Sequence, residues 1–364
     1  MRADLTIDRV LPSRAWAPVD LSQISNYGGR MSSEQRISPE RNLALELVRT
    51  TEAAAMAAAR WVGHGDKIGA DQAAVDAMRS VLGGVQMDGT VVIGEGEKDE
   101  APMLFNGERI GNGEPPHTDI AVDPIDGTTL TATGRAGAIA VIAVAERGSM
   151  FDPGPAVYME KMAVGPEGAG IVDIRLPITK NLSALAKATR KSVRDLNVMV
   201  LDRPRHDEIV AEIRSTGARI TLISDGDVAG AIATAWRDSG VDILFGIGGT
   251  PEGVIAAAAL KCLGGDLQGR LWFRDDEERE EVIAAGYDPD KILGCDDLVS
   301  TTNCFFAATG ITSGELLRGV RFEANSITTQ SLVMRGRSGT ARLIEAIHRP
   351  GKLDDIGAAE AWPN

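Results

Sequence analysis

The sequence has few of the residues that build zinc sites and disulfide frameworks. It contains four histidines and three cysteines, with no H-E-x-x-H motif and no C-x-x-C pair. Zinc sites are typically built from closely spaced histidine and cysteine ligands, and secreted disulfide frameworks use an even set of cysteines. We therefore expect Cys262, Cys295 and Cys304 to be reduced and buried, without a catalytic role.

The chain also lacks long apolar runs and an excess of positive charge. No stretch reaches the roughly 18 consecutive apolar residues of a membrane-spanning helix, and the N-terminal region has no signal-peptide core. The net charge of -14 at pH 7 disfavours nucleic acid and anionic membranes as partners, because both bind basic patches. These absences predict a soluble, cytoplasmic protein, and a local basic cluster could still bind a small anionic substrate.

The first half of the chain mixes helical and strand-like patterns. Residues 1–37 have no sustained apolar period, which predicts a loosely docked extension. Residues 38–190 predict an α+β domain, because helical patterns are followed by short strand-like runs. The helical patterns cover 42–62 and 71–87, and the strand-like runs, expected in one layer, cover 90–93, 119–122, 138–145 and 159–164.

The second half alternates strictly between strands and helices. The expected strands cover 197–201, 219–223 and 241–245, and the helices that follow them cover 207–215, 228–237 and 252–263. This order predicts a doubly wound α/β substrate domain over 191–348, with a parallel sheet and right-handed crossovers. Its last part, 326–334 and 340–347, predicts a hairpin that could return to the first domain, and 349–364 form a tail.

The segment Asp-Pro-Ile-Asp-Gly-Thr-Thr at 123–129 gathers groups suited to phosphate chemistry. Pro124 keeps Asp123 out of the helical conformation, so we expect Asp123 to end its strand and Asp126 to fold back beside it. Gly127 permits a close approach of the backbone, and the amides that follow can face a phosphate oxygen. The same spacing occurs in ordinary turns whose aspartates only cap backbone groups, so the segment alone leaves both interpretations open.

Two more acidic segments favour a metal centre. Gly-Glu-Gly-Glu-Lys-Asp-Glu at 94–100 follows a strand-like run and could be a solvated loop, while Asp71 begins a predicted helix and could merely cap it. Together with 123–129 they offer carboxylates from three element ends, enough for a two-metal site of the kind that transfers phosphoryl groups. Such oxygen ligands suit Mg²⁺ or Mn²⁺.

Four motifs together resemble one enzyme family. They are Gly-Asp-Lys-x-x-x-Asp at 65–71, Ile-Gly-Glu-Gly-Glu at 93–97, Asp-Pro-Ile-Asp-Gly-Thr at 123–128, and Gly-Ile-Gly-Gly-Thr-Pro-Glu-Gly at 246–253. In this order and spacing, from about residue 41 to 348, the chain resembles bacterial class II fructose-1,6-bisphosphatase, a member of the lithium-sensitive phosphatase superfamily. The resemblance implies a layered αβαβα sandwich of the sugar-phosphatase type and a homo-oligomer, either a dimer or a tetramer. It also implies hydrolysis of the 1-phosphate of fructose 1,6-bisphosphate to fructose 6-phosphate, a step of gluconeogenesis.

The resemblance implies roles for individual residues as well. Two or more divalent cations, Mg²⁺ or Mn²⁺, would be held in the first domain and at the helix after Gly249 by Asp71, Glu95, Asp123, Asp126 and Glu252. Some relatives have glutamate at the position of Asp126, which equally supplies a carboxylate. The implied catalytic residues are Thr128, which would orient the attacking water, Lys67 and Asp99. The implied substrate contacts are Asp126, Gly127, Thr128, Tyr158, Arg203, Pro204, Arg205, Asp225, Gly226, Asp227 and Gly249.

The sequence leaves some of these roles open. Lys67 could equally be a solvated loop lysine, and Tyr158 could equally fill an edge of the core. The loop at 201–207 carries Arg203, Arg205 and His206 between a strand and a helix N-terminus, which is a favourable place for a phosphate. This loop favours a bisphosphate over inositol monophosphate, and it does not separate fructose 1,6-bisphosphate from sedoheptulose 1,7-bisphosphate.

Two alternatives belong to other functional classes. A nicotinamide-dependent dehydrogenase is disfavoured, because in the G-x-G-x-x-G fingerprint read from Gly246 the third glycine is Pro251. Glu252 would also face the pyrophosphate with like charge. A non-catalytic sugar-phosphate sensor would not need the full set of metal-binding carboxylates, and it would bind substrate without turnover.

Overall fold

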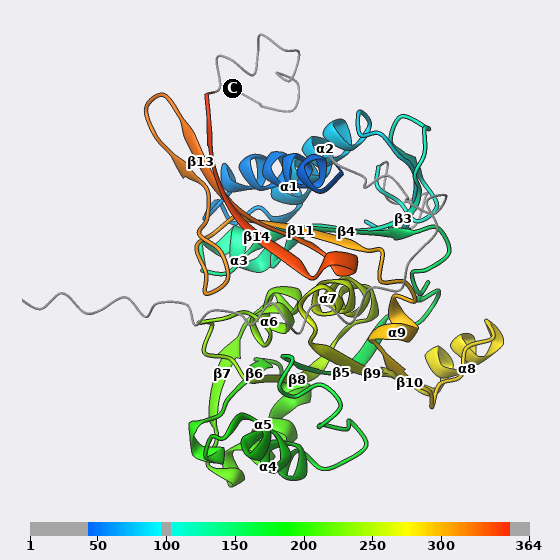
Figure 1. Ribbon diagram of the computed structural model, residues 1–364, viewed down its shortest axis with the longest axis vertical. Helices are drawn as coiled ribbons and strands as arrows, with labels where there is room; N and C mark the ends of the chain where they lie inside the picture. Colours follow the sequence, from blue (N-terminus) through cyan, green and yellow to red (C-terminus); the bar gives the residue numbers. More distant parts are fainter. Residues whose placement is uncertain (1–42, 96–102, 350–364) are drawn as a thin grey trace, which may run out of the picture. The chain divides into compact units, whose positions relative to one another are not determined.

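Two β-sheets and three helical layers make up the described part of the chain (Figure 1). The structure, a computed structural model, describes residues 43–95 and 103–349. The outer helices on the first sheet are α1 (Leu43–Ala59) and α2 (Lys67–Leu82). Between the sheets lie α6 (Asp227–Ala233), α7 (Thr250–Leu263) and the short α9 (Cys295–Leu298). The outer helices on the second sheet are α4 (Ile178–Thr189) and α5 (Asp207–Thr216). The predicted αβαβα sandwich is therefore confirmed.

The first sheet has eight strands in the order β12-β13-β11-β4-β3-β1-β2, and β14 pairs with β13. Its strands are β1 (Asp88–Ile93), β2 (Arg109–Ile110), β3 (His117–Asp126), β4 (Ile139–Glu146), β11 (Phe305–Gly310), β12 (Arg321–Phe322), β13 (Ile327–Arg335) and β14 (Thr340–His348). The predicted C-terminal hairpin is formed by β13 and β14, which pair antiparallel. Strands from both ends of the described chain therefore share one sheet.

The second sheet has six strands in the order β10-β9-β5-β8-β6-β7. They are β5 (Tyr158–Val164), β6 (Asn197–Leu201), β7 (Arg219–Ile223), β8 (Ile243–Gly249), β9 (Asp266–Trp272) and β10 (Ile292–Gly294). As predicted, β6 is parallel to β7 and β8. The sheet is nevertheless mixed, because β5 pairs antiparallel with β8 and β9, and β9 pairs antiparallel with β10.

The strand at 159–164 was expected in the same layer as β1, β3 and β4, and this expectation is wrong. The strand, β5, lies in the middle of the second sheet. A mainly apolar, strand-like run such as this one indicates a buried strand and carries no information about its partners. Pairing of β5 with β8 fixes Tyr158 opposite Gly249 at the edge of the site described below.

The helix expected to start at Asp71 starts four residues earlier. Lys67 is the first residue of α2, and the side chain of Asp66 caps the helix by accepting a hydrogen bond from the Gly69 nitrogen at 2.9 Å. Because Asp66 satisfies an amide of the first turn, Asp71 is not needed as a cap. Its carboxylate lies one turn further along the helix and lines the cavity described below.

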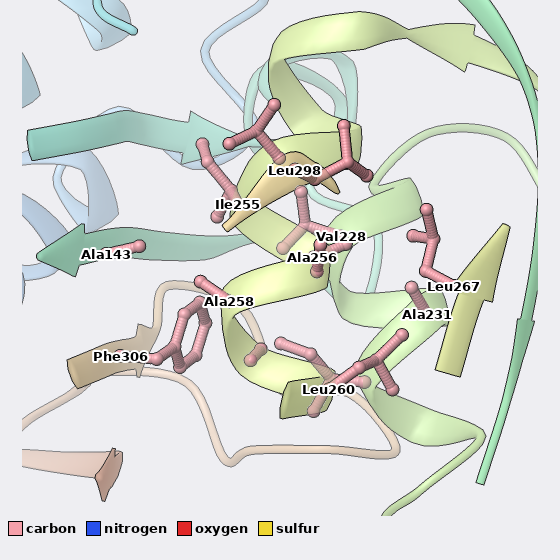
Figure 2. Close-up of a cluster of buried hydrophobic side chains, with 14 of the residues drawn as sticks. Ala143, Val228, Ala231, Ile255, Ala256, Ala258, Leu260, Leu267, Leu298 and Phe306 are labelled. Carbon is pink, nitrogen blue, oxygen red and sulfur yellow. The ribbon is translucent and has the colours of Figure 1, made fainter. Parts of the chain in front are cut away.

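The helix α7 forms the centre of the largest hydrophobic cluster (Figure 2). Four consecutive alanines, residues 256–259, lie in the middle of this helix and are buried, and such small side chains let neighbouring elements approach it closely. Figure 2 shows Ile255, Ala256, Ala258 and Leu260 of α7 among side chains from α6, α9, β4, β9 and β11; Phe306 of β11 is fully buried against it. This central helix also carries Glu252 in its first turn, so core packing holds a candidate site residue in place.

The three cysteines are free and buried, as predicted from their number and spacing. Cys262 and Cys304 lie in contact, with 3.8 Å between their sulfur atoms. Across the described ranges, no helix is both long enough and apolar enough to span a membrane.

Candidate active site

A cavity of about 480 Å³ collects carboxylates from both halves of the chain. It opens where β1 and β3 end and where α2, α6 and α7 begin or make their first turns. Its acidic lining residues are Asp71, Glu95, Asp123, Asp126, Asp225, Asp227 and Glu252, and Lys67, Gly127, Thr128 and Thr129 also line it. The structure thus brings together all five carboxylates that the resemblance assigns to cations.

The backbone of 123–129 places two of these carboxylates side by side. The strand β3 continues through Asp126, so the expectation that Asp123 ends the strand is wrong. A bulge between Asp123 and Asp126 interrupts pairing with β4, and the Asp123 side chain accepts a hydrogen bond from the Ile125 nitrogen at 3.0 Å. A bulge turns consecutive side chains away from strict alternation, so both carboxylates can face the cavity.

Gly127 joins this strand to the helix α3 (Thr128–Thr133) in a left-handed conformation. Its φ of 98° is readily adopted by glycine, and a Cβ at this position would lie 2.9 Å from the Leu130 side chain. The turn brings Thr128 and Thr129 to the cavity. Thr129 accepts a hydrogen bond from Lys67 at 2.9 Å and donates its backbone N–H to Asp225 at 3.2 Å. Lys67 is exposed and contacts the site through Thr129, so its catalytic role stays a prediction.

Asp71 and Glu95 interact at the other side of the cavity. Burial, followed by the neighbouring charges of Asp71 and Glu252, raises the pKa of Glu95 to about 8. The protonated Glu95 donates a hydrogen bond to Asp71, whose own pKa is raised by burial. Two carboxyl groups that hydrogen-bond in this way lie close enough to act on one ion.

The remaining carboxylates repel each other in a buried setting. Burial first, and then the charge of Asp126, raises the pKa of Asp123 well above its ordinary value. Burial and the charge of Asp227 do the same for Asp126 and raise the pKa of Glu252. A cluster of this kind becomes favourable when a cation compensates its charge.

One carboxylate oxygen of the cluster is buried without a hydrogen-bond partner. The Oε2 atom of Glu252 is buried and accepts no hydrogen bond. Within the described ranges, no three acidic, histidine or cysteine side chains already form a compact coordination group. Two observations indicate that a divalent cation fits this cluster. One Glu252 oxygen has no hydrogen-bond partner, and all the candidate ligands are carboxylate oxygens, which such cations prefer.

The basic loop at 203–206 is held against β8 by an uncharged histidine. His206 is fully buried, its Nδ1–H donates to the Leu201 carbonyl at 2.7 Å, and its Nε2 accepts from the Ile247 nitrogen at 2.8 Å. Burial lowers the pKa of His206, consistent with the neutral tautomer that these two bonds require. Arg205 donates to the Ile247 carbonyl at 2.8 Å, and Arg203 lies 3.8 Å from Asp225.

Tyr158 belongs to this basic edge and not to the core. Two guanidinium groups, those of Arg205 and Arg274, lie over its half-buried ring, at 5.6 Å and 5.9 Å from the ring centroid. Trp272 packs against the same ring edge-on. Tyr158 therefore lies next to Arg205, one of the arginines that the resemblance assigns to substrate binding.

Comparison with known proteins identifies the family to which this geometry belongs. The family described as "Bacterial fructose-1,6-bisphosphatase, glpX-encoded" matches residues 41–348. The chain belongs to this family. It is 47% identical over 327 residues to "Fructose-1,6-bisphosphatase 1 class 2" of Escherichia coli (strain K12), a match covering 86% of this chain and 97% of the relative. Identity and coverage are the same for "Fructose-1,6-bisphosphatase class 2" of Shigella flexneri. The resemblance drawn from four motifs is confirmed.

Sequence reasoning missed two basic residues of this bisphosphatase-family site. Arg274 follows β9 and reaches Tyr158 from a distant part of the chain. Lys161 lies on β5, where its ammonium group contacts Asp227. The only signal for Lys161 was a lysine within an apolar strand, and for Arg274 the sequence offered none.

One predicted catalytic residue, Asp99, lies outside the described residues, so its role stays a prediction. The other predicted substrate contacts lie around the cavity or on its basic edge. Pro204 starts the short helical turn between β6 and α5, Gly226 precedes α6, and Gly249 ends β8.

Proposed function

We propose that this member of the bisphosphatase family hydrolyses the 1-phosphate of fructose 1,6-bisphosphate, giving fructose 6-phosphate and inorganic phosphate. The observation that carries the proposal is one cavity in which seven carboxylates face Thr128 and Gly127, with a basic loop at its edge. The carboxylates would bind cations that in turn contact the reacting phosphate, and the arginines of the basic loop would bind the second phosphate.

The donor set indicates which residues would hold divalent cations, Mg²⁺ or Mn²⁺. The family resemblance implies one cation at Asp71 and Glu95 and another at Asp123, Asp126 and Glu252, and all five carboxylates line the cavity. Bound there, the cations would neutralise phosphate charge and make water more acidic. The unpartnered Glu252 oxygen and the mutual repulsion of the buried carboxylates support this use.

The protein groups near these carboxylates have separate tasks. Thr128 begins α3 at the cavity wall, where its hydroxyl orients the attacking water for in-line displacement. Lys67 fixes Thr129 and adds positive charge near the reacting phosphate. The glycine turn at Gly127 lets the phosphate approach the backbone amides closely.

The far end of the substrate would lie on the basic edge. Arg203 and Arg205 pair with the remote phosphate, and the Tyr158 ring contacts the guanidinium group of Arg205. Asp225 and Asp227 face the cavity and accept hydrogen bonds from sugar hydroxyls. Pro204, Gly226 and Gly249 shape the backbone around the sugar.

Release of phosphate from three substrates tests the proposal. Fructose 1,6-bisphosphate, sedoheptulose 1,7-bisphosphate and inositol monophosphate are each supplied with Mg²⁺, Mn²⁺ or excess chelator. We expect turnover of fructose 1,6-bisphosphate that chelator abolishes and either cation restores. Faster turnover of sedoheptulose 1,7-bisphosphate would assign the second sugar as the main substrate, and full activity in chelator would exclude the cation mechanism.

The proposal extends to the setting of the enzyme. We expect the reaction in the cytoplasm, as a step of gluconeogenesis, carried out by a homo-oligomer, either a dimer or a tetramer. Multi-angle light scattering of the purified chain measures the number of subunits directly, and a monomer at assay concentration would contradict this part of the proposal.

A further inference from the structure

Lys161 is a buried lysine directly behind the lining of the candidate site. Its side chain is 4% exposed, and it lies in the middle of β5 between β8 and β9. Burying an ammonium group is costly unless it is paired and hydrogen-bonded. Lys161 meets both conditions, since its Nζ donates to Asp227 at 2.5 Å and to the Gly249 carbonyl at 2.9 Å.

The two partners of Lys161 lie at the N-termini of α6 and α7, two of the helices between the sheets. Asp227 is the first residue of α6 and lines the cavity. Gly249 ends β8 and precedes α7, the helix that carries Glu252. A single ammonium group thus fixes the distance between the first turns of α6 and α7, at the side of the cavity next to Tyr158.

The surrounding glycines leave space for this ion pair. A Cβ at Gly248 would lie 2.2 Å from the Asp227 carboxylate and 3.0 Å from the Lys161 nitrogen. A Cβ at Gly253 would lie 3.4 Å from the Lys161 side chain and 2.5 Å from Met159. Neither glycine has a positive φ, so the close approach of Lys161 and its neighbours, and not backbone conformation, explains why these positions are small.

We propose that Lys161 is a positioning residue for the sugar part of the substrate, acting by holding the Asp227 carboxylate and the Gly249 carbonyl in place. The ammonium group leaves one face of the Asp227 carboxylate directed at the cavity, where it accepts hydrogen bonds from sugar hydroxyls. Lys161 itself does not line the cavity and does not touch substrate. The inference rests on the proposed use of Asp227 as a sugar contact.

The test compares Lys161→Met with Asp227→Asn and with the double variant that carries both changes. Methionine keeps most of the side-chain volume and removes the charge, and Lys187→Met on the exposed face of α4 is the matched control. Fructose 6-phosphate affinity is measured by calorimetry, kcat and KM are measured with fructose 1,6-bisphosphate, and circular dichroism checks the fold.

We expect Lys161→Met to weaken fructose 6-phosphate binding at least about tenfold and to lower kcat/KM about 100-fold, while Lys187→Met behaves as the unchanged chain. The double variant, which leaves no unpaired buried charge, keeps the measurement possible if Lys161→Met does not fold. It should bind fructose 6-phosphate no more weakly than Asp227→Asn alone, because both changes remove the same interaction.

Separate outcomes overturn the two proposals. If Asp227→Asn binds fructose 6-phosphate normally, the proposed use of Asp227 fails. If Asp227→Asn weakens binding and a folded Lys161→Met does not, or if the double variant is additively worse, the role of Lys161 fails while the role of Asp227 stands. Loss of kcat with unchanged fructose 6-phosphate affinity in Lys161→Met also overturns a role in positioning the sugar.

Discussion

Asp126 accepts a hydrogen bond from the backbone nitrogen of Ala229 at 3.0 Å. The carboxylate belongs to β3 of the first sheet, and the amide belongs to α6 in the layer between the sheets. This bond stabilises the junction on which the cavity is built, and it uses only one of the two Asp126 oxygens. The other oxygen is the one that we propose to bind a cation.

Removing the charge of one carboxylate should abolish turnover without unfolding the protein. Asp126→Asn keeps an oxygen that can accept from Ala229. Glu252→Gln keeps the shape of a buried side chain on α7. We expect kcat for fructose 1,6-bisphosphate to fall at least about 100-fold in each, because a neutral amide is a poor ligand for a hard cation. The exposed Glu280→Gln on α8 (Asp276–Ala284) serves as the control, and near-normal kcat in either site variant would remove that residue from the centre.

The hydroxyl of Thr128 should act in the transition state. Thr128→Ala removes the group that we assign to orienting water and leaves the α3 backbone unchanged. We expect kcat to fall about 100-fold and KM to change less than about threefold, because an interaction made only in the transition state affects kcat and not ground-state binding. Steady-state kinetics measures both constants, and a raised KM with normal kcat would make Thr128 a binding residue.

Arg205 should act on the affinity for the remote phosphate. Arg205→Gln removes the charge and loses the bidentate guanidinium, and we expect KM for fructose 1,6-bisphosphate to rise about 10- to 100-fold with a smaller change in kcat. The exposed Arg214→Gln on α5 is the control for loss of one positive charge. An unchanged KM in Arg205→Gln would mean that the remote phosphate binds elsewhere.

Divalent cations should stabilise the folded chain as well as activate it. Burial and mutual repulsion raise the pKa values of Asp123, Asp126 and Glu252, so a bound cation relieves an unfavourable interaction in the folded state. We expect saturating Mn²⁺ or Mg²⁺ to raise the thermal unfolding midpoint by about 5 to 10 °C over a chelated sample. Asp126→Asn should reduce this shift. An equal shift in the variant would place the stabilising cation at another site.

A buried carboxyl far from the cavity should make stability depend on pH. Burial raises the pKa of Glu52 on α1 to about 7, although its side chain accepts a hydrogen bond from Thr329 at 3.1 Å. Between about pH 4.5 and 7 the folded state therefore binds more protons at this site than the unfolded state, so this contribution to stability falls as pH rises. The loss is on the order of 3 kcal/mol by pH 8.

Urea unfolding of Glu52→Gln and of the unchanged chain, at pH 5 and pH 8, measures this contribution. We expect the variant to be the more stable at pH 8, with a smaller difference at pH 5. The neighbouring His348, 3.8 Å away, has a lowered pKa from burial and acts in the opposite direction, and the comparison between the two chains cancels it to first order. Parallel pH profiles for the two chains would contradict the prediction.

Local pattern was sufficient to predict much of the second half. The strands at 197–201 and 219–223 have the predicted bounds, and α7 starts two residues before its predicted first residue. In these segments apolar runs alternate with amphipathic helices at short intervals, so neighbouring elements in sequence are also neighbours in space. Asp225 and Asp227 follow β7 and Glu252 follows β8, so these acidic residues lie at the carboxyl ends of the parallel strands.

Features that depend on partners distant in sequence could not be predicted. The second sheet takes β5 from a segment whose pattern only says that it is buried, and with it come Tyr158 and Lys161. Arg274 meets Tyr158 across more than a hundred residues of chain. The sequence allowed Asp71 to be a helix cap, whereas Asp66, five residues earlier, caps α2. Charge pairing and cation–π contacts of this kind leave no periodic pattern in a sequence.

The burial of α7 has a consequence for how substrates are chosen. Glu252 lies in the first turn of α7, whose alanines are buried in the core between the two sheets. Because this core is close-packed, the α7 backbone has no room to shift when a sugar binds. A wall that does not adapt rejects ligands by their size and stereochemistry. Discrimination between sugars of different chain length therefore depends on how each one fits a preformed surface, and it does not require this side of the cavity to close over the correct one.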